Sequence, residues 1–155
     1  MSQYREFKIN GEPHTIPTDR FYGRENHMWA QYDPSTGQVI IGMDELGITA
    51  LGDLAYVTLL PAGAQVERGK SIGKLEAAKM TGDLSSPVSG VIVARNENAI
   101  RNPGLINQDA YQAGWLVVIQ PTNWDEESAQ LISGQTLPDW VDGEVERYRQ
   151  QGWID

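Results

Sequence analysis

One lysine and its neighbours carry the most distinctive chemistry in this sequence. Lys79 stands in the stretch LEAAKMTGDLSSPVSG, residues 75–90, with two alanines before it and Met-Thr-Gly after it. Small and turn-forming residues of this kind favour the tip of a hairpin, where a primary amine is accessible to a modifying enzyme. A solvated lysine in an ordinary turn is the alternative interpretation, so the surrounding sequence has to distinguish the two.

Few other side chains are candidates for chemistry. The chain has no cysteine and only two histidines, His14 and His27, which excludes disulfides, thiolate metal sites, a cysteine nucleophile and a histidine-rich metal centre. We find no catalytic triad and no acid–base pair, so any thiol chemistry must come from an attached prosthetic group. His27 is a candidate for contact with such a group and for proton transfer, because histidine titrates near neutral pH. The alternative is a strand histidine bonded to the backbone or to a carboxylate.

Charge and hydropathy narrow the classes of partner and location. The 155 residues suffice for one domain with a core, and they carry 12 Lys and Arg against 21 Asp and Glu, a net charge of -9. This balance argues against binding to nucleic acid or to an anionic membrane surface. No apolar run approaches the roughly 20 residues that span a bilayer, and the first residues lack the apolar segment of a secretory signal. The sequence therefore predicts a cytoplasmic protein.

Short segments separated by turn residues predict a mainly β chain. Asn10-Gly11 is the dipeptide that best accepts the positive φ angles of a tight hairpin turn, and it separates the two strands of a predicted N-terminal hairpin. Asp44 is a candidate N-cap for a short helix over 45–51 that Gly52 ends. We predict strands at 5–9, 13–16, 27–32, 38–43, 54–59, 71–77, 84–86, 91–94 and 115–120, and a short helix or turn at 102–108.

A weak internal repeat indicates how these strands pack. Gly52-Asp53-Leu54 recurs as Gly82-Asp83-Leu84, and each copy is followed by a proline and then a glycine. Two similar β halves of this kind would pack into a flattened sandwich. Chance recurrence of a common tripeptide is the alternative.

The last part of the chain differs in charge. Residues 121–155 contain eight acidic and two basic residues, which leaves -6 of the total charge in this segment. We predict helices at 128–132 and 140–150, with enough apolar surface to pack on the body of the protein. The segment is predicted to be either a docking surface for a basic partner or a clasp on the body. Its apolar residues are Trp124, Trp140, Val141, Val145, Tyr148 and Trp153.

Four motifs on both sides of Lys79 form one pattern. Glu76 lies three residues before Lys79 and Gly90 lies eleven after it, while residues 27–29 read HMW and residues 50–57 read ALGDLAYV. Residues 102–116 read NPGLINQDAYQAGWL. Together these motifs resemble the H protein family of the glycine cleavage system, within the lipoyl and biotinyl carriers, in which they read HEW, ALGDIVYV and NPxLINxDxYxxGWL. The resemblance covers residues 20–121.

The resemblance implies a fold, a cofactor and a role for each residue of the site. The fold would be a flattened β-sandwich, the barrel-sandwich hybrid of lipoyl domains, with short peripheral helices and a C-terminal helical tail. Lys79 would carry lipoic acid covalently, Glu76 and Gly90 would be recognised by the lipoate ligase or lipoyl transferase, and His27 would contact the arm. The chain would be a non-catalytic carrier, since the cofactor supplies the chemistry. Its segments would be an N-terminal hairpin extension at 1–19, an H-protein-like lipoyl domain at 20–121 and an acidic helical extension at 122–155.

Departures from the family pattern bear on the pathway. H proteins typically read Glu-Ser-Val-Lys-Ala around the modified lysine, whereas residues 76–80 read Glu-Ala-Ala-Lys-Met. This sequence is closer to the Glu-Ala-Met-Lys-Met of biotin carriers. A biotin carrier is the weaker alternative, because Ala78 stands where biotin carriers have methionine. The two extensions resemble the H-like lipoate-binding proteins of cytoplasmic sulfur oxidation, which work with a heterodisulfide-reductase-like complex. We favour that pathway over the alternative, an H protein that carries the aminomethyl group between glycine cleavage enzymes. Dihydrolipoamide dehydrogenase is a further expected partner.

Overall fold

The computed structural model describes residues 4–9 and 11–154, and the statements below refer to these residues. Its strands and helices confirm the predicted mainly β class, with short peripheral helices and a helical C-terminal tail. The strands are β1 Tyr4–Ile9, β2 Glu12–Pro17, β3 Phe21–Tyr22, β4 Met28–Asp33, β5 Gln38–Met43, β6 Leu54–Leu59, β7 Gln65–Val66, β8 Ser71–Ala77, β9 Thr81–Ser85, β10 Gly90–Arg95 and β11 Val117–Pro121. The helices are α1 Glu45–Leu51, α2 Glu97–Arg101, α3 Gly104–Gln108, α4 Trp124–Ser128, the 3-10 turn η1 Gly134–Thr136 and α5 Leu137–Gln150.

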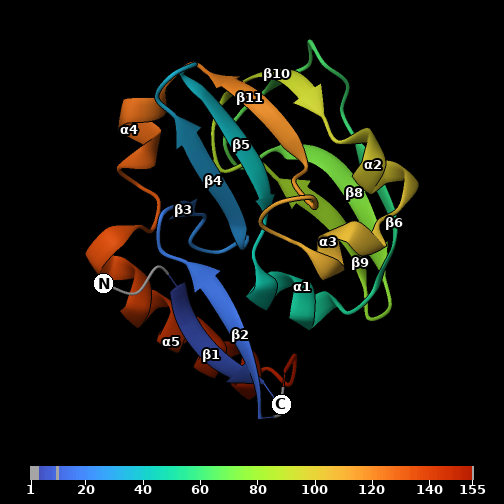
Figure 1. Ribbon diagram of the computed structural model, residues 1–155, viewed down its shortest axis with the longest axis vertical. Coiled ribbons are helices and arrows are strands. Elements are labelled where there is room, and N and C mark those ends of the chain that lie inside the picture. Colours follow the sequence, from blue (N-terminus) through green and yellow to red (C-terminus); the bar gives the residue numbers. More distant parts are fainter. Residues whose placement is uncertain (1–3, 10, 155) are drawn as a thin grey trace.

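Two sheets form the flattened sandwich (Figure 1). One has the strand order β3-β4-β5-β11-β10-β7 and the other the order β6-β8-β9, and all their pairings are antiparallel. Residues two apart on a strand face the same side, so Val39 and Ile41 of β5 and Val57 and Leu59 of β6 enter one core. Burial of these apolar side chains is the main force that holds the two sheets together.

Helix α1 has the ends that the sequence predicts. The carboxylate of Asp44 accepts a hydrogen bond from the backbone N–H of Gly47 at 2.9 Å, which satisfies one of the free N–H groups at the start of the helix. Gly52 follows the last helical residue with a φ of 83°, a left-handed value that glycine adopts without strain. Helix α1 thus leads the chain from β5 directly into β6.

Strands β9 and β11 begin two or more residues away from their predicted starts, and the short strands β3 and β7 and helix α2 were not predicted. Strand β9 begins at Thr81, not at residue 84, because it pairs with β8 from Glu76 onward. Strand β11 begins at Val117, two residues after the predicted start at Trp115. Helix α2 was not predicted, although Asn96 caps it by accepting hydrogen bonds from the N–H groups of Asn98 and Ala99. Helix α3 lies within the predicted segment 102–108.

The two copies of Gly-Asp-Leu adopt different structures. Gly52 ends α1, whereas Gly82 lies inside β9 opposite Leu75. The tripeptide is therefore no structural repeat, even though the sandwich that it suggested is present.

A second hydrophobic cluster joins the two ends of the chain beside the sandwich. The hairpin β1–β2 and α5 lie together next to the sandwich, as Figure 1 shows, and Arg5 of β1 forms an ion pair with Asp142 of α5 at 2.6 Å. Asn10 of the predicted hairpin turn lies outside the described residues, and Gly11 has a φ of 78°. The division of the chain at residues 19 and 121 stays a prediction. The cluster comprises Phe7, Ile9, Ile16, Tyr22, Trp29, Leu46, Ile132, Leu137, Val141, Val145, Tyr148 and Ile154.

Of the two helices predicted in the acidic tail, one is present and the other is not. The predicted helix at 140–150 is confirmed within α5, which starts earlier, at Leu137, with a proline in its first turn. The predicted helix at 128–132 is wrong. Helix α4 ends at Ser128, and Ile132 instead exchanges two backbone hydrogen bonds with Tyr22, at 2.8 and 2.9 Å. That bridge holds the chain extended where the helix was expected.

Among the described residues, no helix combines the length and the apolar character needed to cross a bilayer. A cytoplasmic location stays a prediction from the sequence.

Candidate functional site

Lys79 lies at the tip of the hairpin between β8 and β9. The backbone N–H of Ala77 donates to the carbonyl of Met80 at 2.9 Å and closes the turn around Ala78 and Lys79. The Lys79 side chain is exposed, and its Nζ lies 3.4 Å from the carbonyl oxygen of Thr49, a long hydrogen bond. The amine is thus accessible at a tight turn, as the sequence predicts.

The hairpin tip is braced against the end of α1. The N–H of Ala78 donates to the carbonyl of Asp53 at 3.0 Å, and the N–H of Lys79 donates to the carbonyl of Leu51 at 3.1 Å. A Cβ on Gly52 would lie 3.3 Å from the Cβ of Ala78, and the φ of Gly52 is positive as well. Small residues at both positions therefore let the two loops touch. The brace fixes the backbone of Lys79 while its side chain stays free to be modified.

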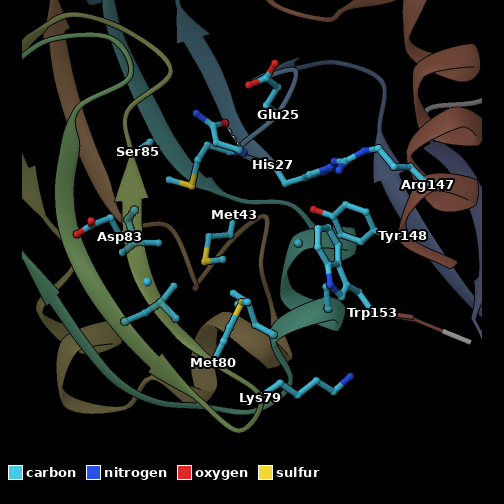
Figure 2. Close-up of a pocket in the computed structure, with 18 of the residues that line it drawn as sticks. Glu25, His27, Met43, Lys79, Met80, Asp83, Ser85, Arg147, Tyr148 and Trp153 are labelled. Carbon is cyan, nitrogen blue, oxygen red and sulfur yellow. Dashed lines mark hydrogen bonds between the residues drawn. The ribbon is translucent and has the colours of Figure 1, made fainter. Parts of the chain in front are cut away.

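A cavity of about 610 Å³ opens beside Lys79, and Lys79 itself lines it (Figure 2). Its apolar wall includes the thioethers of Met28, Met43 and Met80. The exposed residues Glu25 and Asp83 also line the cavity, and Figure 2 shows their carboxylates directed away from its centre. Another part of the wall comes from α5 and the turn that follows it, with the side chains of Arg147, Tyr148 and Trp153.

His27 is buried at the inner edge of this cavity between two carboxylates. Its Nδ1 lies 2.8 Å from Asp44 and its Nε2 lies 2.9 Å from Glu144, so both ring nitrogens are engaged. The backbone of His27 has a φ of 57°, which brings the ring between α1 and α5. This arrangement supports the interpretation of a histidine bonded to carboxylates. Contact between His27 and a lipoyl arm stays a prediction.

The two carboxylates determine the charge of His27. Burial lowers the pKa of His27, but the charge and hydrogen bond of Asp44 and then those of Glu144 outweigh it and raise the pKa to about 9. Burial raises the pKa of Glu144, but hydrogen bonds from Arg147 and His27 outweigh it and lower the pKa to about 2. His27 is therefore a cation near neutral pH, held by two anions, and it pins α5 to the sandwich.

Glu76 lies on the outer face of the three-stranded sheet. It is exposed between Tyr56 of β6 and Thr81 of β9, and it does not line the cavity beside Lys79. The alternation of β8 explains this position, since Leu75 enters the core and its neighbour must face outward. A modifying enzyme that approaches the hairpin has access to Glu76, but recognition of this residue stays a prediction.

Gly90 has a packing role at the start of β10. It pairs with Val66 on one side and Pro121 on the other, and a Cβ here would lie 2.2 Å from the carbonyl oxygen of Gln120. Its φ is not positive, so close strand packing, and not an unusual backbone conformation, accounts for a glycine at this position. Gly90 does not line the cavity beside Lys79. Its recognition by a lipoylating enzyme stays a prediction.

The sequence interpretation missed the residues that α5 contributes. Glu144 and Arg147 are bonded through two hydrogen bonds of 2.7 and 2.9 Å, and their spacing of three residues in a predicted helix was a usable signal for that pair. No sequence signal linked Glu144 to His27, because 117 residues separate them.

The comparisons with known proteins agree with this geometry. Residues 20–143 match the family model for the glycine cleavage H-protein. The chain belongs to the glycine cleavage H-protein family. Family members are non-catalytic carrier subunits that bear lipoate covalently on a lysine. The exposed amine of Lys79, at a braced tip beside an apolar cavity, fits such a group.

Individual relatives cover most of the chain. The glycine cleavage system H protein of Carboxydothermus hydrogenoformans is 34% identical over 84% of this chain and 98% of its own length. That of Thermus thermophilus is 36% identical over 77% of this chain and 91% of its own length. The crystal structure of a glycine cleavage system H protein from Mycobacterium marinum superposes with a TM-score of 0.69 at 35% identity, covering 83% of this chain and 98% of that one.

Proposed function

We propose that this chain is the lipoyl carrier of a glycine cleavage system, with lipoate joined as an amide to Nζ of Lys79. The observation that carries the proposal is the position of Lys79, exposed at a braced hairpin tip and on the rim of the cavity. The motifs on both sides of this lysine and the family of the chain support the same assignment. The lipoyl group, when bound, supplies two sulfurs that take up and release the aminomethyl group.

The proposal implies four kinds of partner. A lipoate ligase or lipoyl transferase attaches the group, glycine decarboxylase and aminomethyltransferase load and unload it, and dihydrolipoamide dehydrogenase reoxidises it. A tether anchored at Lys79 raises the local concentration of the arm at each docked enzyme, while the residues of this chain bind and orient it.

The preference for sulfur oxidation is not supported by the comparisons, which name glycine cleavage H proteins. That preference rested on the two extensions of the chain. In the structure, the hairpin β1–β2 and α5 bury their apolar residues in a common cluster, so a structural role accounts for much of their sequence. A role of the extensions in docking to a heterodisulfide-reductase-like complex would require their outer surface.

The deciding experiment follows the carboxyl carbon of glycine. We expect the lipoylated chain to support release of labelled carbon dioxide from carboxyl-labelled glycine by a glycine decarboxylase, and the unmodified chain to give none. No release, together with binding to the purified heterodisulfide-reductase-like complex, would overturn the proposed pathway and leave the carrier role. Streptavidin blotting of the same preparation tests the biotin alternative, and a positive blot would overturn the assignment of lipoate as the attached group.

A further inference from the structure

The outer face of the three-stranded sheet is hollowed beside the tip that carries Lys79. Strands β6, β8 and β9 form this sheet (Figure 1), and their outward side chains are exposed in two cross-strand rows. The row nearer to the tip consists of Tyr56, Glu76 and Thr81, and the next row consists of Thr58, Lys74 and Asp83. All six residues line a cavity of about 390 Å³, which we call the outer hollow.

Two side chains of the first row have no partner within the described part of the chain. Tyr56 is 57% exposed. Neither its hydroxyl nor the carboxylate of Glu76 makes a hydrogen bond or an ion pair with any of residues 4–9 and 11–154. The two residues are paired directly across β6 and β8, and side chains in such positions lie next to each other. An aromatic ring and a carboxylate therefore face solvent side by side.

This combination fits a planar cation. A guanidinium group stacks on an aromatic ring and forms paired hydrogen bonds with a carboxylate. The outer hollow has the carboxylates of Glu76 and Asp83 against the single ammonium of Lys74. The net charge of -9 on the whole chain attracts a cationic partner in the same sense. The outer hollow is thus suited to an arginine side chain of another protein.

The position of the outer hollow indicates which protein supplies that arginine. An enzyme that modifies Lys79 has to enclose the hairpin tip and so covers the surface next to it. On one side the tip is backed by the end of α1, which binds the backbone of Ala78 and Lys79. The row of Tyr56 is close to the tip as well, because Glu76 pairs with Thr81 at the last position before the turn.

We propose that the outer hollow is a docking surface for the enzyme that lipoylates Lys79, and that it receives an arginine side chain of that enzyme. Tyr56 is then a specificity-determining residue for the modification, together with Glu76. The proposal rests on the proposed attachment of lipoate to Lys79. It adds Tyr56 and the chemistry of the contacting group to the role expected for Glu76.

Initial rates of lipoylation at several concentrations of the full chain test the role of the ring. The probe is a lipoate ligase with lipoic acid and ATP, and the product is followed by intact mass. We expect Tyr56→Ala to raise KM for the chain about tenfold, as for truncation of an interface tyrosine. We expect kcat to stay within about twofold, since the contacts that brace Lys79 are untouched. An unchanged KM would overturn the proposal.

Two further variants separate docking from folding. Tyr56→Phe retains the ring and is expected to restore most of the wild-type KM. Tyr32→Ala is the matched control, because Tyr32 is an exposed tyrosine of β4 in the other sheet, stacked on Trp124. It should leave KM unchanged. Melting temperatures check that each variant is folded, and an equal rise in KM for Tyr32→Ala and Tyr56→Ala would contradict a local contact.

Changes of charge at Glu76 test the sign of the partner. Glu76→Gln is expected to raise KM, and Glu76→Arg is expected to raise it further, because an arginine would then meet a like charge. Asp125→Asn, which removes a carboxylate from α4, is the control that leaves KM unchanged. A lower KM for Glu76→Arg would show that the contacting group is an anion and would overturn the proposal.

A double variant tests whether one group contacts both residues. If a single guanidinium binds the ring and the carboxylate, Glu76→Gln should have little further effect on KM once Tyr56 is alanine. Effects that simply multiply would contradict a shared arginine. Mass mapping of the modified residue separates this proposal from the proposed function. A wild-type chain without lipoate on Lys79 refutes both, whereas a lipoylated chain whose KM ignores Tyr56 refutes only the docking.

Discussion

Replacement of His27 by glutamine tests how far its ion pairs hold α5 against the start of α1. His27 is 1% exposed, and its cationic ring lies between Asp44 and Glu144. A rise in its pKa from 6.5 to about 9 corresponds to roughly 3 kcal/mol of stabilisation. Removing one partner of a buried ion pair costs about 3–5 kcal/mol. We therefore expect His27→Gln to lower the free energy of unfolding by about 3 kcal/mol at pH 7.

The ion pairs of His27 with Asp44 and Glu144 make the free energy of unfolding depend on pH in one direction. Because the pKa of His27 is raised in the folded protein, its contribution is fully present below 6.5 and is lost as the pH rises through about 9. Between pH 7 and pH 9.5 we expect this contribution to fall by about 2 kcal/mol. His27→Gln lacks the titrating group, so the difference in stability between wild type and variant should shrink by that amount.

Urea unfolding followed by tryptophan fluorescence, at several pH values from 7 to 9.5, measures both quantities. His14→Gln is the matched control, since His14 faces the single carboxylate of Glu45 at 3.2 Å in a more exposed setting, and its loss should cost no more than about 1 kcal/mol. A difference between wild type and His27→Gln that stays constant or grows with pH would refute the reasoning.

Three further substitutions test the packing and the modification surface. Gly90→Ala is expected to cost about 1–3 kcal/mol in urea unfolding, because its Cβ would lie 2.2 Å from a backbone oxygen. Gly82→Ala, with nothing within 4 Å, is the control, and an equal loss in both would show that packing is not the cause. Val141→Ala, in the second cluster, should lower the unfolding free energy by about 2 kcal/mol, whereas Asp142→Ala, which removes an exposed ion pair, should change it by less than about 1 kcal/mol. Similar losses would mean that charge, and not burial, holds α5. Glu76→Ala should slow lipoylation, followed by intact mass over time, while stability changes by no more than about 0.5 kcal/mol; unchanged kinetics would leave Glu76 as a solvated charge.

Local signals explain most of what the sequence predicted correctly. Strands β6 and β8 have the predicted bounds, because alternating apolar residues and turn residues mark them in the chain itself. Helix α1 also has its predicted bounds, since Asp44 and Gly52 act within a few residues of its ends. Lys79 was identified in the same way, from its immediate neighbours.

Long-range contacts explain what the sequence could not show. The extended bridge of Ile132 with Tyr22 overrides a plausible helix, because the pairing partner lies 110 residues away. Trp153 joins the cavity of Lys79 only through the fold of α5 onto the sandwich. The close approach of Gly90 to Gln120 depends on the pairing of β10 with β11. Each of these required the tertiary structure.

Intact-mass measurement after lipoylation tests the central claim most directly. The full chain is incubated with a lipoate ligase, lipoic acid and ATP, beside the variants Lys79→Ala and Lys74→Ala. Lys74 is the matched control, an exposed lysine on the same strand that leads to the hairpin tip. The account predicts one lipoyl group on the wild type and on Lys74→Ala, and none on a folded Lys79→Ala protein. A lipoyl group on Lys79→Ala, or its loss from Lys74→Ala alone, would contradict it.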